Sequence, residues 1–255
     1  MSAWKAIILG LVQGLTEFLP VSSSGHLVIA QSLLGIEEPA LIFDVFVHLG
    51  TLVAVFAAFW PDIWGILKRP FRKITALLLV ACIPTALMGV LLNDFFTSLF
   101  SSLTAVALAL CVTGVLLWIS DYFHGRKNIE DMNFGHALTI GFFQGCAITP
   151  GLSRSGSTIF GALLCGLKRS EAAKFSFILS IPAILGAGIL ETADMLQAGT
   201  FQVSWAYILG AAVAAVSGYW AIRFFIKLLE KAHLRYFSLY CWLVAAIVLL
   251  RQWIG

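Results

Sequence analysis

The stretch Leu11–His26 reads LVQGLTEFLPVSSSGH, and it places a polar segment inside an otherwise apolar run, Ala3–Leu34. A second apolar run, His136–Gly166, is broken in the same way by TPGLSRSG at residues 149–156. Each flank is too short to cross a bilayer comfortably, and the Pro and Gly residues of the breaks stop helices. Non-helical backbone at membrane depth is tolerated only where protein or water satisfies it. The sequence therefore predicts two re-entrant helical hairpins, each with a buried polar tip.

The two broken runs are copies of each other. Gln13 begins a Gln-Gly pair that is followed by Gly25, and Gln144 begins the same pair, followed by Gly156 at the same spacing. The offset is 144 − 13 = 131 residues. The chain is therefore predicted to contain an internal repeat, with one hairpin at the start of each copy.

Six further apolar segments are each long enough to cross a bilayer, because a helix rises about 1.5 Å per residue and the hydrocarbon core is about 30 Å thick. Shifting the first two by the same offset places them on the fourth and fifth. The predicted fold is an all-α integral membrane protein with a single membrane domain, residues 1–255, made of repeats at about 1–125 and 132–255. Each repeat has one hairpin and three spans, and because three is odd the second repeat is inverted. The spans are Phe43–Trp60, Ile74–Leu92, Leu103–Ser120, Ala172–Leu190, Trp205–Phe225 and Phe237–Ile254.

The composition supports a membrane location. The chain is 60% hydrophobic and 11% charged, with a mean hydropathy of +0.95, whereas soluble domains are roughly 25% charged. Lipid must therefore be the solvent for most of the surface. Nucleic acid is not an expected partner, since the basic residues form short clusters between apolar runs.

The basic residues are also distributed unevenly between the two sides of the predicted topology. Lys5 and Arg251 fall on the side of the termini, and thirteen basic residues fall on the other side. Positive charge accumulates in cytoplasmic loops, so the termini are expected outside and the first hairpin is expected to enter from outside. The thirteen are Lys68, Arg69, Arg72, Lys73, Arg126, Lys127, Lys168, Arg169, Lys174, Arg223, Lys227, Lys231 and Arg235.

Ionisable residues at membrane depth are costly and indicate function, and the hairpins carry Glu17, His26 and Arg154. An Arg among hydroxyls on a Gly-containing turn can hold a phosphate with two parallel donors. Ser23 and His26 are candidates for nucleophile and base, and Glu17 for orienting that His or binding a divalent ion. Helix N-termini at the tips add free N–H groups for an anion. Together these features predict phosphoryl transfer, in which positioning and charge neutralisation supply most of the rate.

The two motifs resemble the signatures of the undecaprenyl-diphosphate phosphatase family, also called the bacitracin-resistance family. LVQGLTEFLPVSSSGH is similar to the first signature, with Gln13 where some members have a second carboxylate, and PGLSRSGST at 150–158 is similar to the second at every fixed position. The resemblance implies hydrolysis of undecaprenyl diphosphate, which recycles the lipid carrier for cell-wall synthesis. It also implies a bacterial inner-membrane location, a site open to the extracytoplasmic side, and a divalent cation, Mg²⁺ or Ca²⁺, associated with the substrate.

Carried over by position, this resemblance assigns roles to the polar residues of both motifs. Glu17 is also a candidate metal ligand. For Ser22, Ser24 and Thr158, bonding within the helices is an equally good interpretation. The catalytic candidates are Glu17, Ser23, His26 and Arg154, and the candidate substrate contacts are Gln13, Ser22, Ser24, Ser153, Ser155 and Thr158.

Two other functions compete with this one. A lipid-phosphate flippase is an alternative, because secondary transporters use inverted repeats with broken helices. A lipid phosphatase of the phosphatidic-acid type is suggested by Ser-Gly-His at 24–26, but no His follows Arg154 at the spacing that such enzymes need. His48 on the first span is interpreted as a packing residue, and Asp44 as a helix-start residue that complements the helix dipole. The sequence leaves open whether the chain forms a homodimer and whether Ser23, His26 or water is the nucleophile.

Overall fold

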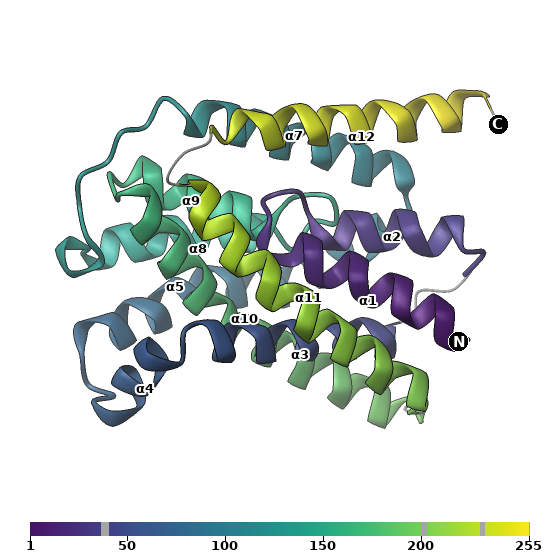
Figure 1. Ribbon diagram of the computed structural model, residues 1–255, viewed down its shortest axis with the longest axis horizontal. Helices are drawn as coiled ribbons and strands as arrows, with labels where there is room; N and C mark the ends of the chain where they lie inside the picture. The colour runs from purple at the N-terminus through teal and green to yellow at the C-terminus, as the bar shows by residue number, and fades with distance from the viewer. Residues whose placement is uncertain (37–40, 200–202, 230–232, 255) are drawn as a thin grey trace.

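The computed structural model describes residues 1–36, 41–199, 203–229 and 233–254, and every element longer than one isolated bridge in this part is a helix (Figure 1). The all-helical prediction is confirmed. The helices are α1 (Ala3–Phe18), α2 (Ser23–Leu33), α3 (Leu41–Ala58), α4 (Trp60–Lys68), α5 (Lys73–Leu91), α6 (Asn93–Phe100), α7 (Leu103–Ser120), the 3₁₀ turn η1 (Ile129–Asp131), α8 (Phe134–Cys146), α9 (Arg154–Leu164), α10 (Arg169–Gln197), α11 (Trp205–Leu229) and α12 (Arg235–Ile254).

The membrane-spanning prediction is confirmed with one change of shape. Among the described residues, α5, α7, α10, α11 and α12 are each long and apolar enough to cross a membrane. The first predicted span, Phe43–Trp60, corresponds to the first part of a broken helix: α3 and α4 meet at a bend of 84°. Pro61 lies in the first turn of α4, where its ring is tolerated but its missing N–H cannot continue α3.

The fourth span is longer than the apolar segment that predicted it. The fourth was predicted as Ala172–Leu190, but α10 continues to Gln197. Its last turns contain Glu, Ala, Met, Leu and Gln, which favour a helix whatever their polarity. The apolar pattern ends at the first charged residues, whereas the backbone hydrogen bonds of the helix continue through them. The short helix α6, between the second and third spans, was not predicted.

Both hairpins have the predicted form of two short helices joined at a polar break. The backbone leaves α1 after Phe18 and starts α2 at Ser23; it leaves α8 after Cys146 and starts α9 at Arg154. The residue before each second helix caps it through its side chain. Ser22 Oγ accepts from the N–H of Gly25 at 3.2 Å, and Ser153 Oγ accepts from the N–H of Gly156 at 3.0 Å. Ser and Thr are preferred at this position because the hydroxyl satisfies an otherwise free helix N–H.

The two tips touch each other in a symmetric way. Gly25 lies against Gly151, and Gly156 lies against Pro20; Pro20 and Gly151 differ by 131, as do Gly25 and Gly156. The hydroxyl of Ser155 also donates to the Leu19 carbonyl of the other tip at 3.1 Å. This reciprocal contact agrees with the inverted repeat, which otherwise stays a prediction, as does the division of the single domain into its two halves.

Each hairpin also packs on the second long span of the other half. A side chain at Gly10 of α1 would collide with the backbone of Gly210 in α11, and one at Gly141 of α8 would collide with that of Ala81 in α5. Small residues permit such close helix contacts, which supply most of the packing energy available inside lipid. These glycines therefore set the distance between each hairpin and the spans beside it.

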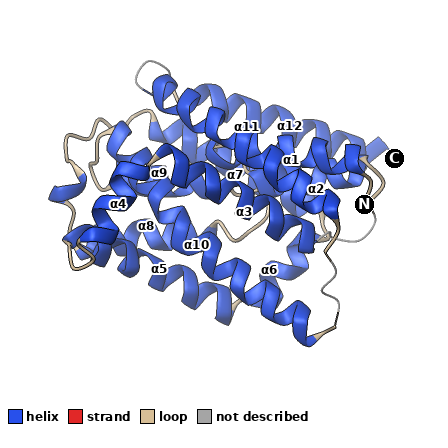
Figure 2. Ribbon diagram, turned by 60° about the horizontal axis from the view of Figure 1, so that its bottom comes forward, coloured by secondary structure: helices blue, strands red, loops and turns tan. Residues whose placement is uncertain are grey.

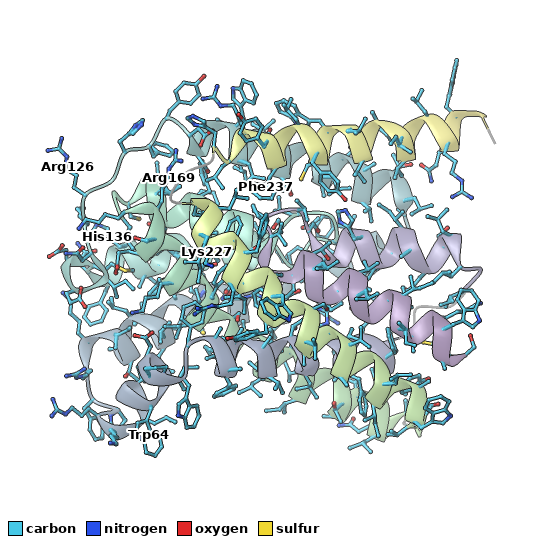
Figure 3. The ribbon with its side chains drawn as sticks, viewed as in Figure 1. Trp64, Arg126, His136, Arg169, Lys227 and Phe237 are labelled. Carbon is cyan, nitrogen blue, oxygen red and sulfur yellow. The ribbon has the colours of Figure 1, made fainter. Side chains whose placement is uncertain are left out.

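Most of the long helices run roughly along the long axis of the molecule, with both termini at one end (Figures 1 and 2). The helix α4 lies at the other end, together with Arg126 and His136 (Figure 3). The side-by-side termini agree with the predicted topology, and Lys231, counted in the basic cluster, lies outside the described residues. Which end faces the cytoplasm stays a prediction.

The interior is aromatic and the flanks are apolar. Phe18 of the first hairpin packs edge-on against Phe177 at 5.5 Å between ring centroids, and Phe177 also contacts Phe225 at 6.0 Å. On the outside, Leu79 is 62% exposed and Ile189 67% exposed. Large apolar side chains left open on this scale are expected where lipid covers the surface.

Candidate active site

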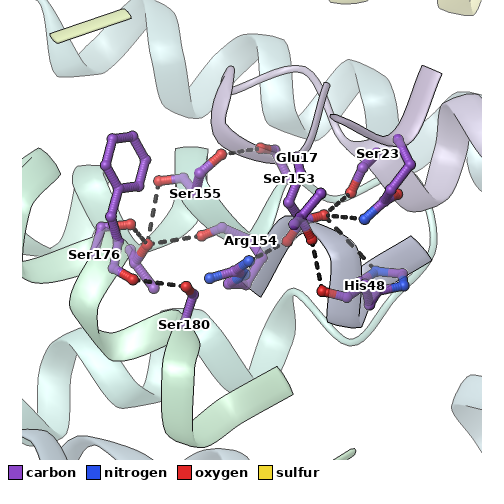
Figure 4. A network of polar contacts seen from close by, with 12 residues as sticks. Glu17, Ser23, His48, Ser153, Arg154, Ser155, Ser176 and Ser180 are labelled. Atoms are coloured by element: carbon purple, nitrogen blue, oxygen red, sulfur yellow. Dashed lines mark hydrogen bonds and ion pairs between the residues drawn. The ribbon is translucent and has the colours of Figure 1, made fainter. Parts of the chain in front are cut away.

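Glu17 is the centre of the polar network between the hairpins. It lies in the last turn of α1, and its side chain is 4% exposed. Ser23, the first residue of α2, donates to Glu17 Oε2 at 2.5 Å, and Arg154, the first residue of α9, donates through Nη2 to Oε1 (Figure 4). Both hairpins are therefore needed to complete the site.

Two further side chains approach the same carboxylate. Gln13, one turn earlier on α1, donates through Nε2 to Glu17 Oε2 at 2.9 Å. His48 of α3 brings Nε2 to 3.7 Å from that oxygen. The structure thus brings the predicted residues Gln13, Glu17, Ser23 and Arg154 together. A buried carboxylate with this many donors is stabilised in its charged form.

Among the described residues, some polar atoms of the site have no protein partner. Arg154 Nη1 is buried and unbonded, although Nη2 of the same guanidinium is paired with Glu17. Gln13 Oε1 and Ser157 Oγ are buried and unbonded as well. A buried donor without a partner costs about 1–3 kcal/mol. Nη1 of Arg154 is therefore available to donate to a ligand in the site, while Nη2 stays bonded to Glu17.

The two hairpin helices also direct their N-termini to this region. In the described part of the chain, the N–H groups of Ser23 and Ser24 in α2, and of Arg154 and Ser155 in α9, have no hydrogen-bond partner. Free N–H groups and the positive end of the helix dipole favour an anion at such a position. Two helix N-termini and one guanidinium therefore surround a single buried carboxylate.

His26 is oriented away from the carboxylate by its bonds. Its Nδ1 lies 2.7 Å from the Ser22 carbonyl, and its Nε2 lies 2.8 Å from the hydroxyl of Tyr240. The two rings are stacked with centroids 5.6 Å apart. No hydrogen bond joins His26 to Ser23 or Glu17. The role of His26 as a base for Ser23 stays a prediction, and these bonds do not support it.

The remaining predicted substrate contacts make bonds inside the hairpins. Ser22 and Ser153 cap their helices, and each hydroxyl also lies near the serine two residues on, Ser24 at 3.3 Å and Ser155 at 3.2 Å. Thr158 is fully buried, and its hydroxyl lies 2.8 Å from the Arg154 carbonyl and 2.5 Å from Ser176 Oγ of α10. These bonds fix the start of α9 against α10, whereas contact with substrate stays a prediction.

His48, which the sequence interpretation treats as a packing residue, is a candidate member of the site. Its side chain faces Glu17 and is 31% exposed. Its Nδ1 bonds to the Asp44 carbonyl at 2.7 Å. Asp44 itself is held by Gln31 Nε2 at 2.9 Å, so it has a tertiary partner besides its position near the start of α3. An ionisable residue four positions after an Asp, on a span next to the first hairpin, was the available signal.

The site between the hairpins offers few protein ligands for a divalent cation. Among the described residues, no group of three or more His, Cys, Asp or Glu side chains lies close enough to hold a metal. Both oxygens of Glu17 already accept hydrogen bonds, and Gln13 Oε1 is the unpartnered oxygen beside them. Two protein oxygens suit a Mg²⁺ ion that arrives with phosphate ligands of its own better than a resident metal.

Broken helices that meet at a guanidinium–carboxylate centre define a class: polytopic membrane proteins that bind an anionic group at membrane depth. Comparison with known proteins gives the family. The model of the family described as bacitracin resistance protein BacA matches residues 6–247, and this chain belongs to that family.

Named relatives match over the whole length. The undecaprenyl-diphosphatase of Halothermothrix orenii is 46% identical, with 98% of each chain covered. That of Carboxydothermus hydrogenoformans is 44% identical, covering 100% of this chain and 99% of the relative. That of Methanobrevibacter smithii is 42% identical, with 97% of each chain covered.

Proposed function

We propose that this protein hydrolyses undecaprenyl diphosphate to undecaprenyl phosphate and inorganic phosphate, which recycles the lipid carrier for cell-wall synthesis. Family membership and the names of the relatives support the substrate. The observation that supports the chemistry is the state of the Arg154 guanidinium: Nη2 is bonded to Glu17, and the buried Nη1 has no partner among the described residues. This guanidinium lies near two helix N-termini. A diphosphate brings the negative charge and the acceptor oxygens that this arrangement lacks.

In the proposed reaction Arg154 and the free N–H groups of α2 and α9 hold the terminal phosphoryl group. Preorganised donors of this kind stabilise charge that develops in the transition state. Ser23 Oγ attacks the terminal phosphorus, its proton passes to Glu17 Oε2 at 2.5 Å, and the bond to the bridging oxygen breaks. Lipid monophosphate leaves with that oxygen, and water then hydrolyses the phosphoserine to free phosphate. Direct attack by water, with Glu17 as the same proton acceptor, is the competing sequence.

A divalent cation, Mg²⁺ or Ca²⁺, is proposed to enter with the diphosphate. Glu17 and Gln13 Oε1 are the residues that would hold it, as the unpartnered amide oxygen suggests. When bound, such a cation neutralises phosphate charge. Gln13 supplies an oxygen without charge, so this site holds the cation less firmly than one with two carboxylates.

The proposed location is the bacterial inner membrane, with the termini and the mouth of the site on the extracytoplasmic side. The excess of basic residues at the opposite end supports this orientation, because cytoplasmic loops carry the positive charge.

Phosphate release from undecaprenyl diphosphate by the purified protein in detergent, with Mg²⁺, tests the function. Hydrolysis needs no second compartment, so we expect free phosphate and lipid monophosphate in equal amounts. A protein that binds the lipid diphosphate but releases no phosphate under any divalent cation would contradict the enzyme and favour the flippase.

A further inference from the structure

The helix α4 turns sharply away from the span that precedes it. The bend between α3 and α4 is 84°, and a helix at nearly a right angle to a membrane-spanning helix lies along the membrane surface. At the end of the molecule opposite the termini, α4 is the outermost labelled helix (Figure 1). Its position is therefore that of an interfacial helix, at the boundary between the acyl chains and the headgroups of the bilayer.

Two neighbouring faces of α4 are apolar, and the protein covers only one of them. Ile63, which is 5% exposed, and Ile66 pack on the main hydrophobic core. On the adjacent face Trp60, Trp64 and Leu67 follow each other at the spacing of one helix stripe and are 51%, 46% and 58% exposed. Trp side chains collect at the level of the headgroups in membrane proteins. The exposed face of α4 is therefore placed to contact lipid.

Positive charge follows directly after this face. Lys68, Arg69 and Arg72 are all exposed, and among the described residues none of them has a salt bridge or a side-chain hydrogen bond. The ammonium of Lys68 lies over the Trp64 ring, 5.2 Å from its centroid. Phe71, between the two arginines, is fully exposed. Basic and aromatic side chains are thus mixed on one surface.

The nearby acidic residue does not neutralise this charge. Asp62, the acid on α4, is paired with Lys174 of α10 at 2.6 Å. The next basic residue, Lys73, is also engaged, since it donates to the Glu130 carbonyl at 2.8 Å. Positive charge without a protein counter-ion is therefore concentrated in the three residues of the preceding turn and loop.

We propose that residues 60–72, here called the interfacial elbow, bind the headgroup of an anionic phospholipid. Lys68, Arg69 and Arg72 hold the phosphate, for which the planar guanidinium offers two parallel donors, and the exposed aromatic side chains lie beside the glycerol and the upper acyl chains. A soluble anion would leave these aromatic side chains uncovered, and a zwitterionic headgroup would leave the cations without net negative charge. The elbow makes no bond to Glu17 or Arg154, so this inference does not depend on the proposed function.

The first test counts bound lipids by native mass spectrometry while the purified protein is titrated with phosphatidylglycerol or with phosphatidylcholine of the same acyl chains. We expect the wild type to bind phosphatidylglycerol more tightly. Each basic residue at an anionic surface contributes roughly fivefold to binding, so the triple variant Lys68→Gln, Arg69→Gln, Arg72→Gln should bind phosphatidylglycerol more than about tenfold more weakly and lose the preference.

The matched control is the triple variant Arg126→Gln, Arg223→Gln, Lys227→Gln, which removes the same charge from exposed positions outside the elbow. It should keep the preference for phosphatidylglycerol. Equal weakening in both triple variants would overturn the elbow as the site, as would a wild type without a preference or an elbow variant that keeps it. A wild-type dimer that the elbow variant converts to a monomer would assign this surface to a second copy of the chain and overturn the lipid.

The second test measures where the elbow lies in vesicles that contain phosphatidylglycerol. After the native cysteines have been replaced, a nitroxide is attached at Leu67→Cys or, as the control, at Arg126→Cys, which lies at the outer edge of the same end (Figure 3). We expect the label at position 67 to collide more often with oxygen, which dissolves in lipid, than with a water-soluble nickel complex. The label at position 126 should show the reverse. A water-like pattern at position 67 would overturn the elbow as a lipid-binding surface.

Discussion

Ser23 and Arg154 occupy equivalent positions in the two hairpins and donate to opposite oxygens of one carboxylate. They differ by 154 − 23 = 131 residues, and each begins the second helix of its hairpin. Ser23 reaches Glu17 Oε2 and Arg154 reaches Oε1. The residue equivalent to Glu17 in the second hairpin is Ile148. The repeated sequence therefore carries an asymmetric site, in which the first hairpin supplies the acid and the hydroxyl and the second supplies the guanidinium.

Arg154→Lys separates a phosphate clamp from a partner that only balances charge. Lysine keeps the positive charge beside Glu17 but offers a point charge instead of a planar fork. Loss of one preorganised donor costs about 10²–10³ in kcat, and we expect at least that loss. Phosphate release gives the rate, and a thermal melt should show stability close to that of the wild type.

Arg154→Ala is the companion variant. It leaves the buried Glu17 carboxylate without its cation, and breaking a buried pair in this way costs about 3–5 kcal/mol. We expect it to be inactive and clearly less stable. A lysine variant within a few-fold of wild-type turnover would contradict the clamp.

Glu17→Gln keeps the shape of the side chain and removes its charge. Ser23 and Gln13 can still bond to the amide, but the proton of the nucleophile has no acceptor. Removal of a general base costs ~10²–10⁴ in rate, and we expect a loss in this range in phosphate release. Near-normal turnover would remove Glu17 from the chemical step.

Ser23→Ala distinguishes the two nucleophiles. If Ser23 attacks phosphorus, the alanine variant should bind lipid diphosphate and release no phosphate. Mass spectrometry after a rapid acid quench should then find a phosphoserine at position 23 in the wild type. Substantial turnover by the variant would assign the attack to water, with Glu17 unchanged as proton acceptor.

Most of the fold could be predicted because lipid imposes simple rules on sequence. Apolar length predicted the spans, and the paired breaks predicted the hairpins, whose tips do meet at Gly25 and Gly151. The bend between α3 and α4 and the polar end of α10 were missed, since hydropathy reports the solvent around a helix and not its axis or its backbone bonds.

For the site, the sequence could predict which residues come together but not how their side chains are oriented. The motifs predicted which residues gather, and Glu17, Ser23 and Arg154 do. The sequence did not predict the orientation of the side chains. The ring of His26 bonds to Tyr240, 214 positions away, and the ring of His48 faces Glu17. Both choices depend on tertiary contacts between helices, which spacing along one helix does not record.

Gly141→Ala should destabilise the protein, because its Cβ would collide with the Ala81 carbonyl of α5. Overpacking of this kind costs about 1–3 kcal/mol. Gly186→Ala is the matched control: Gly186 lies within α10 with nothing near the new Cβ, and alanine is the better helix former. We expect a lower melting temperature for the first variant and no decrease for the second. Equal melting temperatures would contradict close packing of the second hairpin on α5.

The orientation of the two halves is tested by labelling single cysteines in intact cells with a membrane-impermeant maleimide, after the native cysteines have been replaced. Ser2→Cys precedes the first hairpin and Lys127→Cys lies between the two halves. A hairpin returns to its own side and three spans do not, so these positions should lie on opposite faces. Since basic residues gather at the end that carries Lys127, we expect Ser2→Cys to react from outside and Lys127→Cys to react only after the membrane is permeabilised. Reaction of both positions in intact cells would contradict the inverted repeat, whereas the reverse pattern would keep the repeat and invert the protein in the membrane.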